Sequence, residues 1–405
     1  MAMFTMYVQV VKRVAPLVFA ATLVHCSSNS SAPVTDAGAD AGVCSSFSDA
    51  VFAVDPNGPD TQVHAASAFA GGRVFVVYDR PKGSDKTKLD VFLAAFRCDG
   101  KPAFAPVRVS DGDGNDVDPS VAVHGDRVVV AWASDSGAAQ NNLSLRVRTF
   151  DDAGVAIGPS RAYVGPRKGT TNALNAWMAQ VAPSASGFAL VGAWGVAEAP
   201  AFQAFGARLD AQGASLGESI DLGFEATVTE TIPDVVTIAG ATLAAFQVEP
   251  NQGTGSHVDV VRIDDGATTA TKLSTLDDAQ APSLAASGAS VWLAASRSAT
   301  SSVLWHVSDG AAKPIDVGFG AAPSIAAATN GGAIVATVMD ASHRQLKLAR
   351  FDDTGALSNE AVIVADVPPY ALRLVTVDPA GVFFLGYQEG ASPAFRVKGR
   401  FFDLR

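Results

Sequence analysis

The chain has 405 residues, of which 48% are hydrophobic and 17% are charged, so it can bury a large core and does not belong to the disordered class. Its formal net charge at pH 7 is −11. Nucleic acids and anionic lipid headgroups bind to basic surfaces, so this charge argues against both as partners of the folded protein.

The N-terminus carries an export signal. Lys12 and Arg13 precede an apolar run, residues 14–24, which is too short to span a bilayer as a helix but suits the central region of a secretory signal. A tract rich in Ser, Ala, Gly and Asp follows. We therefore expect a signal peptide over 1–25 and a disordered linker over 26–46.

The signal ends in the letters "LVHC" at residues 23–26. A signal that stops at a cysteine before such a tract resembles that of bacterial lipoproteins. Leu23 matches the pattern of that family, whereas His25 departs from it, because a small residue is usual there. The resemblance implies lipidation of Cys26 and a cell-envelope protein, in the outer membrane, held to the membrane by its acyl chains alone. Ordinary cleavage after Ala32, giving a periplasmic or secreted protein, is the alternative.

The stretch "DPSVAVHGDRVVVAW" (Asp118–Trp132) predicts two short strands around a tight turn, and similar stretches recur down the chain. The second strands of these hairpins end at Tyr78, Trp132, Trp194, Phe246, Ala295, Val338 and Tyr387. A third strand follows each hairpin and in most copies closes on an Arg, an Asp and a Gly turn, as in "ARFDDTG". We expect the Asp to fix the turn and the aromatic residues to pack between repeats.

Six repeats have four strands, and the seventh stops after three. Residues 48–55 have the pattern of the missing strand and precede the first hairpin. We therefore predict an all-β, seven-bladed β-propeller over 47–405, in which the N-terminal strand closes the last blade and removes an exposed edge. The fifth unit is short, which leaves a six-bladed ring as the alternative.

The repeat pattern of a Pro-led hairpin ending in Trp, followed by R-F-D-x-x-G, resembles repeats in large secreted haemolysin-type and adhesin proteins of bacteria. It is also similar to repeat lipoproteins of Gram-negative soil bacteria. The likeness covers about residues 47–405 and depends on small and turn residues. It therefore implies a fold and transfers no catalytic residue.

The strand order predicts a loop face, formed by the connections from the second strand to the third and from the fourth strand to the next blade, and an opposite turn face. The long, variable loops lie on the loop face, where we expect any binding site. Cys44 and Cys98 fall on the turn face in adjacent blades, so the geometry permits a disulfide between them.

One loop has the composition of a cation site. In "SDGDGNDVDPS", side-chain oxygens occur at near-alternate positions, at Asp111, Asp113, Asn115 and Asp118. The loop departs from the EF-hand form because Asp116 replaces the glycine and no bidentate Glu follows. Calcium is thus a minor hypothesis beside a plain turn, and no other cofactor is indicated.

The sequence contains no P-loop, HExxH or CxxC motif, and the S-x-D-x-G-x-T-W box of sialidase-type propellers is absent. Our leading expectation is a monomeric, non-enzymatic module that binds a glycan or an envelope protein through its loop face. A carbohydrate-active hydrolase or lyase, with carboxylates that converge from distant loops, is the main alternative. A scaffold subunit of an envelope complex is the third.

Overall fold

The computed structural model describes residues 44, 46–59, 61–83, 85–135, 143–163, 176–195, 202–224, 228–250, 255–298, 300–307, 314–317, 320–328, 331–340, 345–364, 369–378, 381–391 and 394–404. The predicted signal peptide, Cys26 and most of the predicted linker lie outside these ranges. All regular elements within them are β-strands. In the described part of the chain no helix has the length and hydrophobicity needed to cross a membrane.

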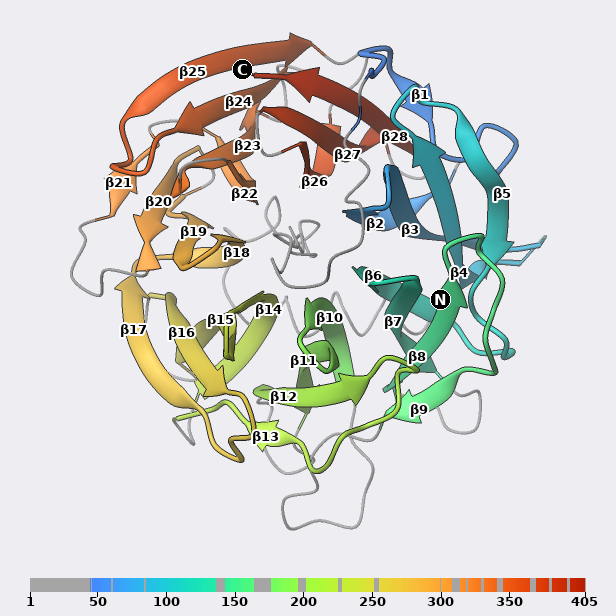
Figure 1. The fold of residues 1–405 in the computed structure, drawn as a ribbon, viewed down its shortest axis with the longest axis horizontal. Coiled ribbons are helices and arrows are strands. Elements are labelled where there is room, and N and C mark those ends of the chain that lie inside the picture. Colours follow the sequence, from blue (N-terminus) through green and yellow to red (C-terminus); the bar gives the residue numbers. More distant parts are fainter. Residues whose placement is uncertain are drawn as a thin grey trace.

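Seven four-stranded antiparallel sheets surround a common axis as the blades of a propeller (Figure 1). The prediction of seven blades is confirmed. Blades 1 to 3 consist of β2 (Val63–Ala70), β3 (Arg73–Lys82), β4 (Asp85–Arg97) and β5 (Pro102–Arg108); β6 (Asp116–His124), β7 (Arg127–Asp135), β8 (Leu143–Asp151) and β9 (Arg161–Tyr163); and β10 (Ala176–Ser184), β11 (Gly187–Gly195), β12 (Phe202–Asp210) and β13 (Ile220–Asp221).

Blades 4 to 6 follow in the same order, from the inner strand outward. They consist of β14 (Val228–Ile238), β15 (Ala241–Pro250), β16 (His257–Asp264) and β17 (Thr271–Asp277); β18 (Gln280–Ser287), β19 (Ser290–Ser296), β20 (Ser302–His306) and β21 (Ile315–Asp316); and β22 (Ala321–Ala327), β23 (Ala333–Asp340), β24 (Gln345–Phe351) and β25 (Leu357–Val364). The fifth unit is a complete blade, because its outermost strand β21 needs only two residues. The six-bladed alternative is therefore wrong.

Blade 7 closes the ring with strands from both ends of the chain. Its order is β26 (Pro369–Asp378), β27 (Val382–Ala391), β28 (Ala394–Asp403) and then β1 (Phe52–Ala53). The predicted closing strand over 48–55 is real but shorter than expected, because its first part bonds elsewhere: Ser48 N–H donates to the Cys98 carbonyl of blade 1 at 3.0 Å. The N-terminal segment thus joins blades 7 and 1.

Cys44 and Cys98 form a disulfide at this closure, with Cα atoms 5.7 Å apart. The Gln62 side chain reinforces the junction, because its Oε1 accepts from Val397 N–H of blade 7 at 3.1 Å while its Nε2 donates to the Asp55 carbonyl at 3.0 Å. Gln62 has no exposed surface. A disulfide and side-chain hydrogen bonds therefore hold the junction together.

Each interface between neighbouring blades, here called a seam and named by its two blades, is filled by apolar side chains from both. The aromatic residues that end the second strands are buried in these seams, as expected: Trp132 packs in seam 1–2, Trp194 in seam 2–3 and Phe246 in seam 3–4. Small inner-strand residues, such as Ala122 and Ala285, bring the blades close together near the axis.

The turn face is built from the repeated Asp turns. Asp151 Oδ1 accepts from Ala153 N–H at 3.0 Å and from Val155 N–H at 2.8 Å, and Asp352 repeats the arrangement with Thr354 and Ala356. The expectation that these Asp residues fix the turns is confirmed. This face is therefore structural, and the search for a site turns to the opposite one.

Candidate functional site

Every inner strand contains a β-bulge near its start, on the side of the loop face. The register shifts lie between Val63 and Ala66, Val117 and Ser120, Trp177 and Gln180, Thr231 and Asp234, Gln280 and Ser283, Ala321 and Ser324, and Tyr370 and Arg373. A bulge adds one residue and redirects a side chain. The seven bulges therefore place one redirected residue per blade around the axis.

Five of these residues have a left-handed backbone, and we call them the axis ring: His64, Asp118, Met178, Ile232 and Ala281, with φ between 49° and 55°. This region disfavours side chains with a Cβ, although Asp and His enter it more readily than Ile. A conformation that costs free energy at the same place in five blades is maintained by the surrounding sheet. Blades 1 and 2 give the ring a polar half.

The polar half forms a cluster from three blades, which we call the axial cluster: His64, Asp79, Asp118 and Trp177. His64 Nδ1 lies 2.7 Å from Asp79 Oδ2, and its Nε2 lies 3.5 Å from Asp118 Oδ1. The second oxygen of Asp118 accepts a hydrogen bond from Trp177 Nε1–H. One imidazole therefore stands between two carboxylates, with an indole at the edge.

The two carboxylates determine the charge of the imidazole. Burial alone would lower the pKa of His64, but Asp79 and Asp118 outweigh it and raise this pKa to about 10. His64 is therefore an imidazolium at neutral pH, while burial raises the pKa of the Asp79 carboxyl. The His64 side chain is 30% exposed and Asp118 11%, whereas Asp79 is fully buried. A ligand at the axis would meet His64 and Asp118 and not Asp79.

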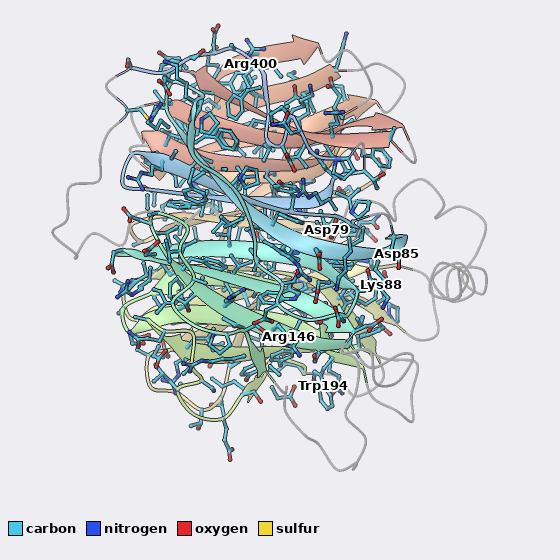
Figure 2. All side chains as sticks on the ribbon, turned by 90° about the vertical axis from the view of Figure 1, so that its right-hand side faces the viewer. Asp79, Asp85, Lys88, Arg146, Trp194 and Arg400 are labelled. Carbon is cyan, nitrogen blue, oxygen red and sulfur yellow. A yellow bond between two sulfur atoms is a disulfide. The ribbon has the colours of Figure 1, made fainter. Side chains whose placement is uncertain are left out.

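Trp177 supplies the apolar surface of the cluster. It is half-buried and packs edge-on against Phe202, with ring centroids 5.8 Å apart. Asp79 lies toward the same face of the disc as Asp85 and Lys88, which follow the turn from β3 to β4 (Figure 2). The loop face therefore combines an aromatic surface with carboxylates at the axis, as expected of a site on that face.

Part of the cluster also connects blades. Asp118 N–H donates to Asp79 Oδ2 at 3.2 Å across seam 1–2. The matching contact in seam 4–5 is neutral, since Ala281 N–H donates to Gln247 Oε1 at 3.0 Å. A polar side chain at the end of the second strand thus holds the bulge of the next blade, and this structural role is independent of any role in a functional site.

A second acidic group is buried away from the axis ring. Glu230 of β14 is 1% exposed, and burial raises its pKa to about 7. Its Oε2 accepts from Ala204 N–H of blade 3 at 2.7 Å. Glu230 therefore bridges seam 3–4 and is not part of the axial cluster.

The four side chains of the predicted calcium loop do not converge. Asp111 Oδ1 lies 2.5 Å from Ser160 Oγ, Asp113 Oδ1 pairs with Lys82 Nζ at 2.9 Å, Asn115 Oδ1 accepts from Leu89 N–H, and Asp118 points to the axis. At Asp113 the ammonium group of Lys82 takes the position that a bound calcium ion would have. Among the described residues no three His, Cys, Asp or Glu side chains form a group that could hold a metal ion.

Sequence patterns alone missed His64, Asp79 and Trp177. A proline follows the bulged residue in four blades, as in Asp118-Pro119 and Ile232-Pro233, and proline within a sheet marks an edge or a bulge, but no proline follows His64 or Met178, so this signal does not reach the three missed residues. The letters "GASLG" at 213–217 also match the G-x-S-x-G spacing of serine hydrolases. They lie between β12 and β13 on the turn face and not in a strand-to-helix elbow.

No family model and no curated protein matches this sequence. Among solved structures, an α-L-arabinofuranosidase from Fusarium graminearum in complex with an iminosugar inhibitor is similar, with 12% identity, a TM-score of 0.51, and coverage of 88% of this chain and 98% of that one. Trypanosoma rangeli sialidase in complex with 2,3-difluorosialic acid has 7% identity, a TM-score of 0.50, and coverage of 88% and 58%. The chain spans a little over half the length of that sialidase. At these identities the likeness extends to the propeller fold alone.

Proposed function

We propose that this protein is a carbohydrate-active β-propeller that hydrolyses a neutral glycoside at the axial cluster. One observation carries the proposal: two carboxylates from different blades flank one protonated imidazole, beside an indole, where all blades meet on the loop face. Glycoside hydrolysis uses a proton donor and a carboxylate on opposite sides of the scissile bond. Both similar enzymes named above act on, or bind, sugars on this fold.

In the proposed reaction, His64 Nε2–H donates its proton to the glycosidic oxygen as the bond from that oxygen to the anomeric carbon breaks. Asp118 stabilises the positive charge that develops on the sugar. Water then adds to the anomeric carbon, and its proton returns to His64. Asp79 is a positioning residue, because it is fully buried and holds Nδ1 of the imidazole. Trp177 is the surface on which an apolar sugar face stacks.

The charge of the site selects for neutral sugars. Two carboxyl groups flank the one imidazolium of the cluster, on a chain with a formal net charge of −11. An acidic sugar such as a sialic acid would be repelled, because the imidazolium of His64 is already neutralised by its two carboxylates. We therefore place the substrate nearer to an arabinofuranoside than to a sialoside.

A non-enzymatic glycan-binding module is the second candidate, and one observation favours it. Both oxygens of Asp118 already have neighbours, His64 Nε2 and Trp177 Nε1, so the carboxylate is engaged within the protein. A cluster that only connects blades would still present Trp177 to a sugar.

We further infer that the protein is exported and anchored through Cys26, which the mass of the mature N-terminus tests.

One experiment separates the candidates. The protein is assayed for release of nitrophenol from neutral furanosides, neutral pyranosides and sialosides, and for retention on the corresponding polysaccharides. We expect turnover of a neutral glycoside and a loss of turnover of at least about a hundredfold in D118N. The control D264N keeps the turnover of the wild type, because the Asp264 carboxylate pairs with Arg262 on the turn face. Retention without turnover, weakened by W177A, would establish the binding module instead. If the protein shows no retention and no turnover, both candidate functions are refuted.

A further inference from the structure

Seam 7–1 contains a buried cation without an anionic partner. Arg373 of β26 is 3% exposed, and among the described residues its Nε and Nη2 have no hydrogen-bond partner. Its Nη1 donates to the adjacent Leu372 carbonyl. A charged group removed from water without compensation is strongly destabilising, so a native protein supplies a partner.

The direction of Arg373 follows from its neighbours along β26. Val375 and Val377 lie on the same side of the strand and pack in the apolar cluster of seam 7–1, while Leu372 and Leu374 pack in seam 6–7. On the facing strand β2, Ala65 and Phe69 pack in the cluster of seam 7–1. Ser67 lies between them on that side, so Arg373 and Ser67 face the same seam.

The other seams show what is missing. In each blade the first residue after the bulge faces the next blade, and in four seams its side-chain oxygen accepts from a backbone N–H of the next inner strand. These pairs are Ser120 with Val181, Asp234 with Leu284, Ser283 with Ile325, and Ser324 with Leu374, at 2.6–3.3 Å. Arg373 occupies the acceptor position of blade 7, and Ser67 the donor position of blade 1.

Seam 7–1 therefore has donors at both of these positions, the guanidinium of Arg373 and the backbone N–H of Ser67, whereas the Ser67 hydroxyl can donate or accept. A guanidinium donates and never accepts, so Arg373 cannot take the place of the serine and aspartate oxygens of the other seams. The Ser67 hydroxyl is also buried and without a partner in the described chain. Nε and Nη2 form one edge of the planar guanidinium, the edge that matches a carboxylate or holds a halide between two N–H groups.

We propose that seam 7–1 holds a small monovalent anion, of the chloride or formate class, bound by the Nε–Nη2 edge of Arg373 and by Ser67. The anion supplies the acceptor that a side chain supplies in the other seams, and it neutralises the buried guanidinium. Burial lowers the pKa of Arg373 to about 9, which leaves it charged at neutral pH and in need of that partner. The site lies beside the ring closure, so occupancy contributes to the stability of the whole propeller.

Thermal unfolding of the full-length protein tests the site. Chloride, bromide or formate replaces the larger anion gluconate at constant ionic strength. We expect the melting temperature to rise by about 2 °C for each tenfold increase of anion above its dissociation constant. R373M removes this dependence and S67A weakens it. The control R350M keeps it, because Arg350 donates to the neutral carbonyl of Leu404 in another seam.

Crystals grown with bromide provide the second measurement and need no variant, should R373M fail to fold. An anomalous peak between Arg373 and Ser67 is the expected result. A melting temperature independent of the anion, or a water molecule at that position in bromide crystals, would overturn the proposal, since water would then be the missing acceptor.

Discussion

Seams 1–2 and 4–5 perform the same structural task with different chemistry. In both, a side chain at the end of the second strand accepts the N–H of a left-handed bulge residue in the next blade: Asp79 accepts from Asp118, and Gln247 from Ala281. For this contact seam 4–5 uses a neutral amide and a methyl group, while its buried carboxylate Asp234 accepts a different backbone N–H, that of Leu284. Seam 1–2 uses two carboxylates and an imidazolium.

The difference separates what the fold requires from what it does not. Gln247 and Ala281 demonstrate that one neutral acceptor suffices to hold a bulge, and that the bulge residue needs no polar side chain. The charges of His64, Asp79 and Asp118 exceed that requirement and cost desolvation. Buried charge beyond structural need is typical of functional sites, which is why we place activity at seam 1–2.

The largest expected effect comes from converting seam 1–2 into a copy of seam 4–5. The double variant D79Q/D118A retains an acceptor for the bulge and places at 118 the residue that seam 4–5 tolerates at the same backbone angle. On the proposed mechanism we expect a folded propeller whose glycosidase turnover falls about a thousandfold, because the carboxylate that would stabilise the charge at the anomeric carbon is lost. Circular dichroism and initial rates measure the two properties. Unchanged turnover would show that the charges are only structural.

Seam 7–1 extends the comparison, since it is the only seam among those described that is closed by a disulfide. Cys44 and Cys98 are 54 residues apart in the sequence. In the chain-entropy model, a cross-link over such a loop reduces the entropy of the unfolded chain and thereby raises its free energy by about 4 kcal/mol. We expect C44S/C98S to lower the melting temperature by roughly 5 °C, with glycosidase turnover retained. A variant with the same melting temperature as the wild type would show that the disulfide is dispensable for stability.

The smallest expected effect is a pH dependence confined to seam 1–2. The folded-state pKa of His64 is about 10, above the usual 6.5, so the stabilisation from its charge is complete below about pH 6.5 and is lost as the pH rises toward 10. We expect H64Q to remove part of the loss of melting temperature between pH 7 and 10. The control Q247E at seam 4–5 leaves that part intact. Parallel curves for H64Q and the wild type would mean that His64 is neutral in the folded protein.

The repeats made most of the fold predictable. Small inner strands recur in every blade, and aromatic second-strand ends and Asp-Gly turns recur in most. The prediction of seven blades and of closure by the N-terminal strand therefore followed from local patterns, with the short fifth unit leaving six blades as the alternative. The length of the closing strand did not follow. Phe52 and Ala53 pair with β28 and Val54 N–H donates to the Val397 carbonyl of the same strand, whereas Ser48 bonds to Cys98, a residue 50 positions away.

The axial cluster was beyond sequence patterns, because its parts are separated along the chain. Asp79 lies 15 residues from His64, and Trp177 lies 59 residues from Asp118. Each residue on its own is an ordinary strand residue. The calcium hypothesis treated neighbouring oxygens in the 111–118 loop as one set, whereas the fold turned Asp113 to Lys82 and Asp118 to the axis.

The sequence by itself determined the all-β class, the seven repeats and the turn chemistry, since these depend on residues close together in the chain. Tertiary structure alone decided which side chains share a seam. Register and bulges rotate each inner strand, and a one-residue shift moves a side chain to the opposite side of its blade. His64 therefore meets Asp118 through the packing of blades 1 and 2, and Arg373 and Ser67 come to the same seam through the closure of the ring, neither through a pattern in the sequence.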